Sequence, residues 1–524
     1  MNNLKSNVFA GITASIVALP LALAFGVASG AGAIAGLYGA IILGFFAALF
    51  GGTSTQISGP TGPMTVITAT AVATFPNDLS SVMSVIFLSG LIQISFGIVG
   101  IGKWIRYIPY PVISGFMSGV GVIILILQIN PFLGVASNSS IILTITNLFE
   151  TIKLANYESL IIATITLLIM FFTPKNISKV VPSALIALVF VTYFSIYMSY
   201  SVDTIGNIPM GFPDFILPFS FDLLNLKDII TLALTLALLG SIDSLLTSLV
   251  ADNMTKTKHN PKKELIGQGI GNTVCSFFGA IPGAGATMRT VININSGGTS
   301  KISGIVHSIS LLLIVLFLAP FAEQIPLAVL SGILIKVGFD ILDYKFLKVI
   351  TKVSRQDLLI MVTVFLLTVF VDLIMAVGVG ITIASILAVY QVSRKTRIKI
   401  QRTKTAFDID IDNNNINIIK IDGSLFFGTA SVLDTKIDSI KHKKFVILDC
   451  KAVAFLDISA IFSIEEIIEK LKTKNIKTIL VLKHAHKRKI LSVGTNQIFK
   501  DINMYFHIDD AINFTQKYEL KNNG

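Results

Sequence analysis

Long apolar runs separated by short polar loops fill the first 393 residues of the chain. A membrane-spanning helix needs about 20 predominantly apolar residues. Runs of about that length lie near 8–28, 33–50, 81–100, 112–130, 158–173, 180–200, 227–250, 302–320, 326–342, 356–373 and 374–393. Shorter apolar pieces, interrupted by glycine and proline, lie near 60–75, 265–281 and 286–296. The pattern predicts a polytopic α-helical membrane protein with about 14 segments.

The pattern changes after Tyr390, where a basic stretch begins and the apolar runs become short. Runs rich in isoleucine, valine and leucine predict strands within 415–428, 445–450 and 478–483. Helical spacing of apolar residues over 458–472 predicts a helix between the last two strands. We therefore expect three parts: a transmembrane domain over 1–393, a basic linker over 394–406 and a soluble α/β domain over 407–524.

Composition agrees with a membrane protein, since 53% of the 524 residues are hydrophobic and only 14% are charged. The net charge of +11 does not indicate nucleic-acid binding, because Lys and Arg gather in alternate loops such as 256–263 and 345–355. Loops rich in Lys and Arg face the cytoplasm. We expect both termini and the soluble domain on the cytoplasmic side of the plasma (inner) membrane. The His and Cys spacing predicts no metal site or bound cofactor.

The membrane region contains an internal repeat. The segment 108–121, IPYPVISGFMSGVG, resembles the segment 325–338, IPLAVLSGILIKVG, and a weaker match pairs 59–66 with 283–291. Two halves of seven segments each insert with opposite orientation, because seven is odd. This 7+7 inverted repeat is the plan of many secondary transporters, in which the two halves move to give alternating access.

Two glycine- and proline-rich breaks interrupt the apolar pattern at 58–63 and 281–287. Irregular backbone at membrane depth is tolerated where it lines a protein cavity, and each break precedes a short apolar helix. Two helix N-termini that face one another would present free N–H groups and positive potential to a small anion. The expected anion-binding residues are Thr61, Gly62, Thr287 and Arg289, the last as a full positive charge.

Asp243 is a carboxylate within an otherwise apolar helix, and such a residue is costly unless it has a partner. Thr247 lies one turn away on the same face. A bound Na⁺, held by Asp243, Thr247 and carbonyl groups of the break at 285–287, would neutralise the carboxylate and let an anion bind beside it. A proton on Asp243, or an ion pair between Asp243 and Arg289 or a lysine, would also explain a carboxylate at membrane depth. Asp243 has no nearby base, nucleophile or metal-ligand partner in the sequence, so the sequence does not indicate an enzyme.

The stretch 33–66, AIAGLYGAIILGFFAALFGGTSTQISGPTGPMTV, resembles the signature region of the SulP (SLC26) family of anion transporters. The C-terminal α/β region resembles the STAS domain that follows the membrane region in that family. Together the two resemblances cover essentially the whole chain. They imply a transporter that works by elevator-like alternating access and forms a homodimer, partly through STAS.

Four further stretches are similar to the Na⁺-dependent bicarbonate transporters of the BicA type found in cyanobacteria; they are 18–32, 242–260, 264–272 and 282–298. This likeness implies a sodium-coupled bicarbonate symporter. It implies a sodium site formed by Asp243, Thr247, Gly285, Ala286 and Thr287. It also implies that Thr61 and the backbone around Ala286 and Thr287 line the bicarbonate site.

Two sequence features and one alternative bear on that expectation. Many proton-coupled or sulfate-type members carry Glu or Gln after the proline of the first helix, whereas 20–24 has no ionisable residue here, which excludes proton coupling through that position and favours Na⁺. Arg289, by contrast, is shared with many general members, and its charge could favour sulfate or another small oxyanion. An anion sensor or a channel that signals through STAS is the alternative of another class. In STAS itself, Ile458 stands where related domains carry a phosphorylated serine, and Ser459 follows it.

Overall fold

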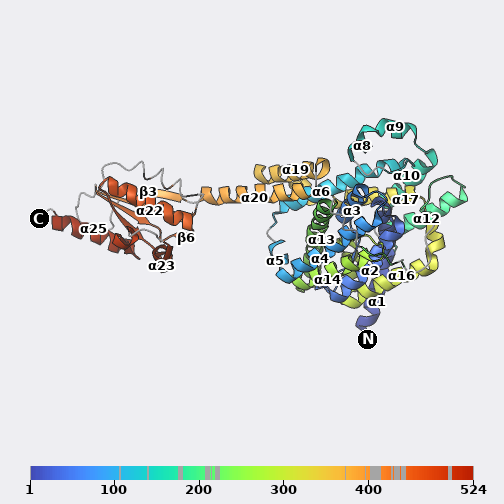
Figure 1. Ribbon diagram of the computed structural model, residues 1–524, viewed down its shortest axis with the longest axis horizontal. Helices are drawn as coiled ribbons and strands as arrows, with labels where there is room; N and C mark the ends of the chain where they lie inside the picture. The colour runs from blue at the N-terminus through green and yellow to red at the C-terminus, as the bar shows by residue number, and fades with distance from the viewer. Residues whose placement is uncertain are drawn as a thin grey trace. The chain divides into compact units, whose positions relative to one another are not determined.

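The computed structural model places the chain in two compact units, residues 1–381 and 382–524 (Figure 1). It describes residues 2–522 apart from gaps at 106–107, 138–140, 175–176, 178–180, 207–212, 214, 219–224, 372, 396, 402–414, 427–428, 430–432, 434–436, 438–443 and 494–497.

Helices lie at every position where the apolar pattern predicts one. The long ones are α1 Asn2–Ala28, α2 Ala33–Phe50, α3 Gly62–Thr74, α4 Leu79–Val99, α6 Tyr110–Leu127, α10 Tyr157–Phe172, α12 Ser183–Tyr197, α13 Leu226–Thr255, α14 Pro261–Ser276, α15 Thr287–Asn295, α16 Lys301–Glu323, α17 Leu327–Ile341, α19 Arg355–Phe370 and α20 Leu373–Lys395. Short helices are α5 Gly102–Ile105, α7 Ile129–Phe132, α8 Ile141–Thr146, α9 Leu148–Lys153 and α18 Tyr344–Val349. The predicted polytopic helical fold is confirmed.

Several helices are shorter than the expected length of about 20 residues. Within the described residues, 6 helices are long and apolar enough to cross a membrane by length and composition. In contrast, α12 and α17 have only 15 residues each. Pro182 and Pro326 fix where these two helices begin, because each proline stands at the N-cap. Hydrophobic runs in the sequence therefore overstate the helix lengths here.

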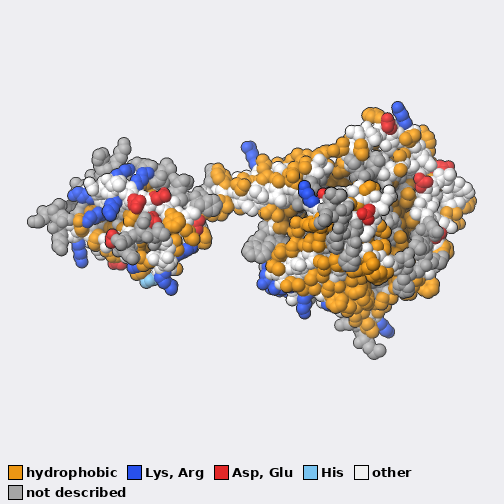
Figure 2. Space-filling view, in the orientation of Figure 1, with side chains coloured by type: hydrophobic (Ala, Val, Ile, Leu, Met, Phe, Trp, Pro, Cys, Tyr) orange, Lys and Arg blue, Asp and Glu red, His pale blue; other side chains and the backbone are white. Residues whose placement is uncertain are grey.

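Packing divides the membrane helices into two bundles, each with helices from both halves of the chain. The first bundle comprises α1–α4 and α13–α16, with α14 packed between α2 and α4, and α16 packed against α1 and α2. The second bundle comprises α6, α10, α12, α17 and α19, with α6 packed against α17 and α19. The bundles meet where α1 packs against α12 and α17, and where α3 packs against α6. Most of the visible surface of this unit is hydrophobic, as expected for helices in lipid (Figure 2).

The soluble unit is built on a sheet of 6 strands in the order β3-β4-β5-β7-β8, with β6 also paired to β4. The strands are β3 Arg397–Gln401, β4 Ile416–Leu425, β5 Phe445–Asp449, β6 Val453–Leu456, β7 Lys477–Val481 and β8 Asn503–Tyr505. Pairing is parallel except between β3 and β4. The helices are α22 Ile458–Thr473, α23 His484–Val493, α24 Ile498–Asp501 and α25 Ile508–Asn522. The predicted α/β domain is confirmed.

Alternate residues of each central strand enter opposite cores, because successive side chains of a strand point to opposite faces. Val446 and Leu448 join the core that contains α22 residues such as Ile464. Phe445 and Ile447 join the core on the other face, which contains Ala511 of α25. Both faces of the sheet are therefore covered by helices.

The prediction of a basic linker over 394–406 is wrong for 397–401. These residues form β3, an edge strand antiparallel to β4, and α20 continues to Lys395. Residues 402–406 lie outside the described part of the chain. The sequence RIKIQ at 397–401 alternates isoleucine with polar residues, as a strand does, but it lies within a strongly basic stretch that resembles a linker. Charged residues are common on edge strands.

Candidate functional site

The two breaks in the helix pattern lie side by side as a short antiparallel bridge between β1 Ser58–Gly59 and β2 Ala284–Gly285. Ser58 pairs with Gly285, and Gly59 pairs with Ala284. The backbones approach so closely that a Cβ on Gly283 would lie 2.1 Å from the carbonyl oxygen of Gly59. Glycine is therefore required at 283, and the two halves of the repeat meet at this crossing.

Each strand of the crossing leads into the N-terminus of a helix. Thr61 is the N-cap of α3, and Ala286 is the N-cap of α15. The first N–H groups of a helix have no partner within the helix and carry partial positive charge. Gly62 points to the second bundle, because a Cβ there would lie 2.8 Å from Ile341 Cδ1 and 3.0 Å from Ile124 Cδ1. The N-terminus of α3 thus faces the boundary between the two bundles.

The Ala286 backbone is less available than the sequence suggested. The Ala286 N–H donates to the carbonyl oxygen of Ile57 at 2.8 Å, so it is not free to bind an anion. Free backbone donors on this side begin with Thr287, the first residue of α15, which is exposed. The family likeness implies that the backbone around Ala286 and Thr287 lines the anion site, and the N–H groups left for that role are those that follow Ala286.

Helix α13 holds the crossing from one side through its hydroxyl groups. The Thr247 hydroxyl lies 2.9 Å from the carbonyl oxygen of Gly285 and 2.6 Å from the Thr287 hydroxyl. One turn earlier, the Ser244 hydroxyl accepts from the Gly285 N–H at 3.0 Å. The structure therefore brings three of the expected cation ligands, Thr247, Gly285 and Thr287, within contact distance of one another.

Asp243 lies one turn before Thr247 on the same helix and is half-buried. Its Oδ2 is buried without a hydrogen-bond partner, and the buried hydroxyl of Thr61 beside it also has none. Asp243 and Pro63 line a small cavity of about 20 Å³ against α6, which has room for about one water molecule or a small ion. A carboxylate and a hydroxyl without partners at membrane depth are groups of the kind that could hold a cation through oxygen.

Arg289 lies in the third position of α15 and is fully buried at 1% exposure. Its Nη2 donates to the carbonyl oxygen of Pro60 at 2.7 Å, while Nη1 has no partner. Among the described residues, neither Asp243 nor Arg289 has an ion-pair partner, so the ion pair considered from the sequence is not formed. The guanidinium instead supports the break at 58–63 by donating to the Pro60 carbonyl, and it adds a fixed positive charge there.

A buried carboxylate that sequence analysis did not assign anchors the first break. Glu264 Oε1 accepts from Gln56 Nε2 and from Gln268 Nε2, both at 2.9 Å, and its Oε2 accepts from the Gly52 N–H at 2.9 Å. Gln56 Oε1 in turn accepts from the Ser248 hydroxyl at 2.9 Å. The spacing of Glu264 and Gln268, one turn apart on α14, was the signal that could have identified this network.

A cavity of about 650 Å³ lies between the bundles beside α15. Its walls come from α1, α10, α12, α15 and α17, and Met288, next to Thr287, lines it. An ion pair between Lys336 and Asp340 lies at its edge. The N-terminus of α15 is therefore close to an opening large enough for water and a small anion.

The sequence matches the sulfate permease family over residues 4–364 and the STAS domain over residues 408–511. Relatives include the bicarbonate transporter BicA of Picosynechococcus sp., 42% identical over 502 residues, which cover 91% of this chain and 88% of the relative. BicA of Synechocystis sp. is also 42% identical, over 90% of this chain and 87% of its own length. A putative sulfate transporter of Bacillus subtilis, YvdB, is 34% identical over 87% of each chain. These relatives are transporters, which are not enzymes.

Solved structures agree with these relatives. The transmembrane domain of a cyanobacterial BicA superposes with a TM-score of 0.67 at 49% identity, covering 72% of this chain and 98% of that one. Murine Slc26a9 in an inward-facing state superposes with a TM-score of 0.85 at 20% identity, covering 98% of this chain and 91% of that one, which shows a shared fold. The chain therefore belongs to the sulfate permease (SulP, SLC26) family of anion transporters, and a STAS domain follows its membrane region.

Proposed function

We propose that this protein is a sodium-coupled bicarbonate symporter that takes up the anion across the plasma membrane by elevator-like alternating access. The observation that carries the proposal is the cluster of partnerless or exposed oxygen groups at the crossing, made by Asp243, Thr61 and Thr287. Similarity to two bicarbonate transporters at 42% identity supports the choice of anion.

In this proposal Na⁺ binds first, to the carboxylate of Asp243, the hydroxyls of Thr247 and Thr287, and carbonyl groups at Gly285 and Ala286. Carboxylates, hydroxyls and unwound backbone carbonyls are the oxygen ligands that transporters use for Na⁺. The carboxylate alone would repel an anion at this short range. Once Na⁺ neutralises it, the N-termini of α3 and α15 attract bicarbonate.

Bicarbonate then binds between the bundles, with Thr61, Gly62 and Thr287 as its donors. The free N–H groups at Gly62 and Thr287 lie at helix N-termini, and Thr61 supplies a hydroxyl. Because the crossing belongs to the first bundle and Gly62 faces the second, movement of one bundle past the other would carry both ions across. The cavity beside α15 is the route to one side, which we assign to the cytoplasm together with both termini.

Sulfate or another small oxyanion is a second candidate substrate. Arg289 supports it, because a buried guanidinium with a free Nη1 adds a full positive charge behind the α3 N-terminus. YvdB is also named as a putative sulfate transporter. Arg289 Nη2 donates to the Pro60 carbonyl. In this proposal Arg289 therefore attracts the anion by its charge at a distance rather than by a bidentate contact.

Uptake of labelled bicarbonate and labelled sulfate into proteoliposomes, each with and without an inward Na⁺ gradient, tests the proposal. We expect bicarbonate uptake that rises with the Na⁺ gradient and exceeds sulfate uptake. Sulfate flux above bicarbonate flux would assign the second substrate. Anion binding without flux would indicate a sensor, and conductance without Na⁺ dependence would indicate a channel.

A further inference from the structure

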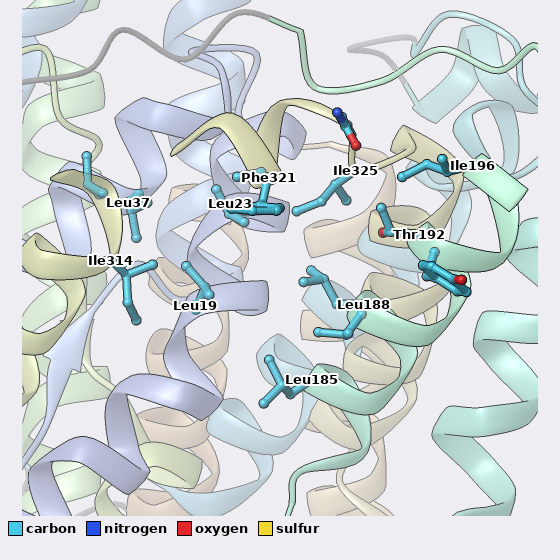
Figure 3. Close-up of a pocket in the computed structure, with 15 residues that line it drawn as sticks. Leu19, Leu23, Leu37, Leu185, Leu188, Thr192, Ile196, Ile314, Phe321 and Ile325 are labelled. Carbon is cyan, nitrogen blue, oxygen red and sulfur yellow. The ribbon is translucent and has the colours of Figure 1, made fainter. Parts of the chain in front are cut away.

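A long apolar groove lies between the two bundles, away from the crossing of β1 and β2. It has a volume of about 360 Å³ and is lined almost entirely by apolar side chains. Figure 3 shows Leu19 and Ile314, from α1 and α16, on one side, and Leu185 and Leu188, from α12, on the other. The groove therefore has one wall in each bundle.

The groove continues into a polar cavity at one end. This second cavity has a volume of about 410 Å³ and shares Ile196 and Gln324 with the groove. Its lining includes Ser199, Tyr200 and Glu323. A narrow apolar space that opens into a polar one matches an amphipathic ligand with an apolar chain and a polar head.

Thr192 lines the groove close to that junction (Figure 3). It is 8% exposed, and its Oγ1 is buried without a hydrogen-bond partner. A buried hydroxyl without a partner is unfavourable, and a ligand acceptor such as an ester carbonyl would relieve this cost. The groove thus offers a donor at the level where chain and head of an amphipathic ligand would join.

The length of the groove corresponds to one leaflet of a bilayer. Along α12 it extends from Leu185 to Ile196, roughly 16 Å at about 1.5 Å per residue. Half of a hydrocarbon core of about 30 Å is about 15 Å. The side chains around the groove also face lipid, since Phe190 is 56% and Phe317 73% exposed. An acyl chain of a surrounding lipid can therefore enter the groove directly from its own leaflet.

We propose that the groove is a binding site for one glycerophospholipid, with an acyl chain between α12 and the first bundle and the headgroup in the polar cavity. The headgroup is zwitterionic with an amine, because Glu323 is the charged residue among the described residues that line this cavity. In the orientation proposed above, the lipid belongs to the outer leaflet. Because it touches both bundles, it lies where they would slide past each other.

The test uses the full-length protein in liposomes that contain a phosphatidylethanolamine with a photoactivatable diazirine on its acyl chain. After illumination, mass spectrometry of the digested protein locates the labelled residues. We expect labelling of groove residues on both α12 and α16, normalised to labelling of exposed lipid-facing residues. The same measurement is made with a phosphatidylglycerol that carries the same chain.

Two groove variants and one matched control sharpen the result. Leu188→Trp fills the groove and should reduce groove labelling at least fivefold, whereas Phe190→Trp, on the lipid-facing side of the same helix, should leave it unchanged. Thr192→Val keeps the shape and removes the hydroxyl, so it should reduce groove labelling about twofold or more if that hydroxyl binds the lipid. This isosteric variant keeps the test valid if Leu188→Trp fails to fold.

Equal groove labelling in Leu188→Trp and the parent protein would overturn the site, as would labelling spread evenly over the lipid-facing surface. Unchanged labelling in Thr192→Val would remove Thr192 from it. We expect phosphatidylethanolamine to label the groove at least threefold more than phosphatidylglycerol. Equal or stronger labelling by phosphatidylglycerol would overturn the headgroup assignment.

Discussion

Replacing Asp243 with asparagine isolates the role of one charge. The substitution keeps the size of the side chain, and Oδ2 has no hydrogen-bond partner in the protein that would be lost. Removing a half-buried charge also removes its desolvation penalty. We therefore expect Asp243→Asn to fold normally, with a thermal midpoint equal to or above that of the parent protein, so that any transport defect can be attributed to ion binding.

The expected size of the defect follows from the position of the carboxylate. A full charge about 4 Å from Na⁺ contributes about 4 kcal/mol at an effective dielectric constant of 20. Asp243 is only half-buried, so solvent screening reduces this to about 2–3 kcal/mol. At about 1.4 kcal/mol per tenfold change, the Na⁺ concentration for half-maximal bicarbonate uptake should rise roughly 30- to 150-fold.

The assay is a Na⁺ titration of labelled bicarbonate uptake into proteoliposomes. Asp228→Asn is the control, because Asp228 is an exposed carboxylate in the first turn of the same helix, about 22 Å from Asp243 along the axis. Its titration should match that of the parent protein. A half-maximal Na⁺ concentration in Asp243→Asn within twofold of the parent value would refute the assignment of Asp243 to the cation site.

Three further predictions concern the crossing and the STAS domain. Gly285→Ala should abolish uptake, because its Cβ would lie 2.1 Å from Gln56 Nε2, whereas Gly378→Ala, with nothing within 4 Å, should retain it; equal uptake would contradict this. Asp457→Ala removes the side chain that caps α22, so the free energy of opening measured by hydrogen exchange in the first turn of α22 should fall by about 1 kcal/mol. Replacing the exposed Ser459 with alanine should leave this free energy unchanged, and equal exchange in the two variants would contradict the cap. Burial raises the pKa of the Cys450 thiol to about 12, so maleimide at pH 8 should label it after denaturation but not before.

The sequence determines much of this fold because apolar length and internal repetition report directly on membrane insertion. Repeat matching placed the breaks at 58–63 and 281–287 in corresponding positions, and the structure pairs them at Ser58 and Gly285. The spacing of Asp243 and Thr247 placed both on one face of a helix, as observed. These features depend on local periodicity, which a single sequence carries.

Features that depend on contacts distant in sequence were not predictable. The Ala286 N–H is engaged by Ile57, more than two hundred residues earlier, and no local pattern announces that bond. The carboxylate of Glu264 gains its role from Gln56 in the other half of the chain. The strand β3 is a different case, because its partner β4 is the next strand along the chain, and the basic residues around Ile398 and Ile400 concealed the alternating pattern.

The measurement that most directly tests the coupling is uptake of radioactive Na⁺ driven by bicarbonate alone. Proteoliposomes are prepared with equal Na⁺ on both sides and an inward bicarbonate gradient, with the membrane potential clamped at zero. A symporter that binds both ions at the crossing must move Na⁺ inward even though there is no Na⁺ gradient. The Asp243→Asn variant should lose this uptake, and the Asp228→Asn variant should keep it. Bicarbonate entry without Na⁺ accumulation in the parent protein would contradict the account.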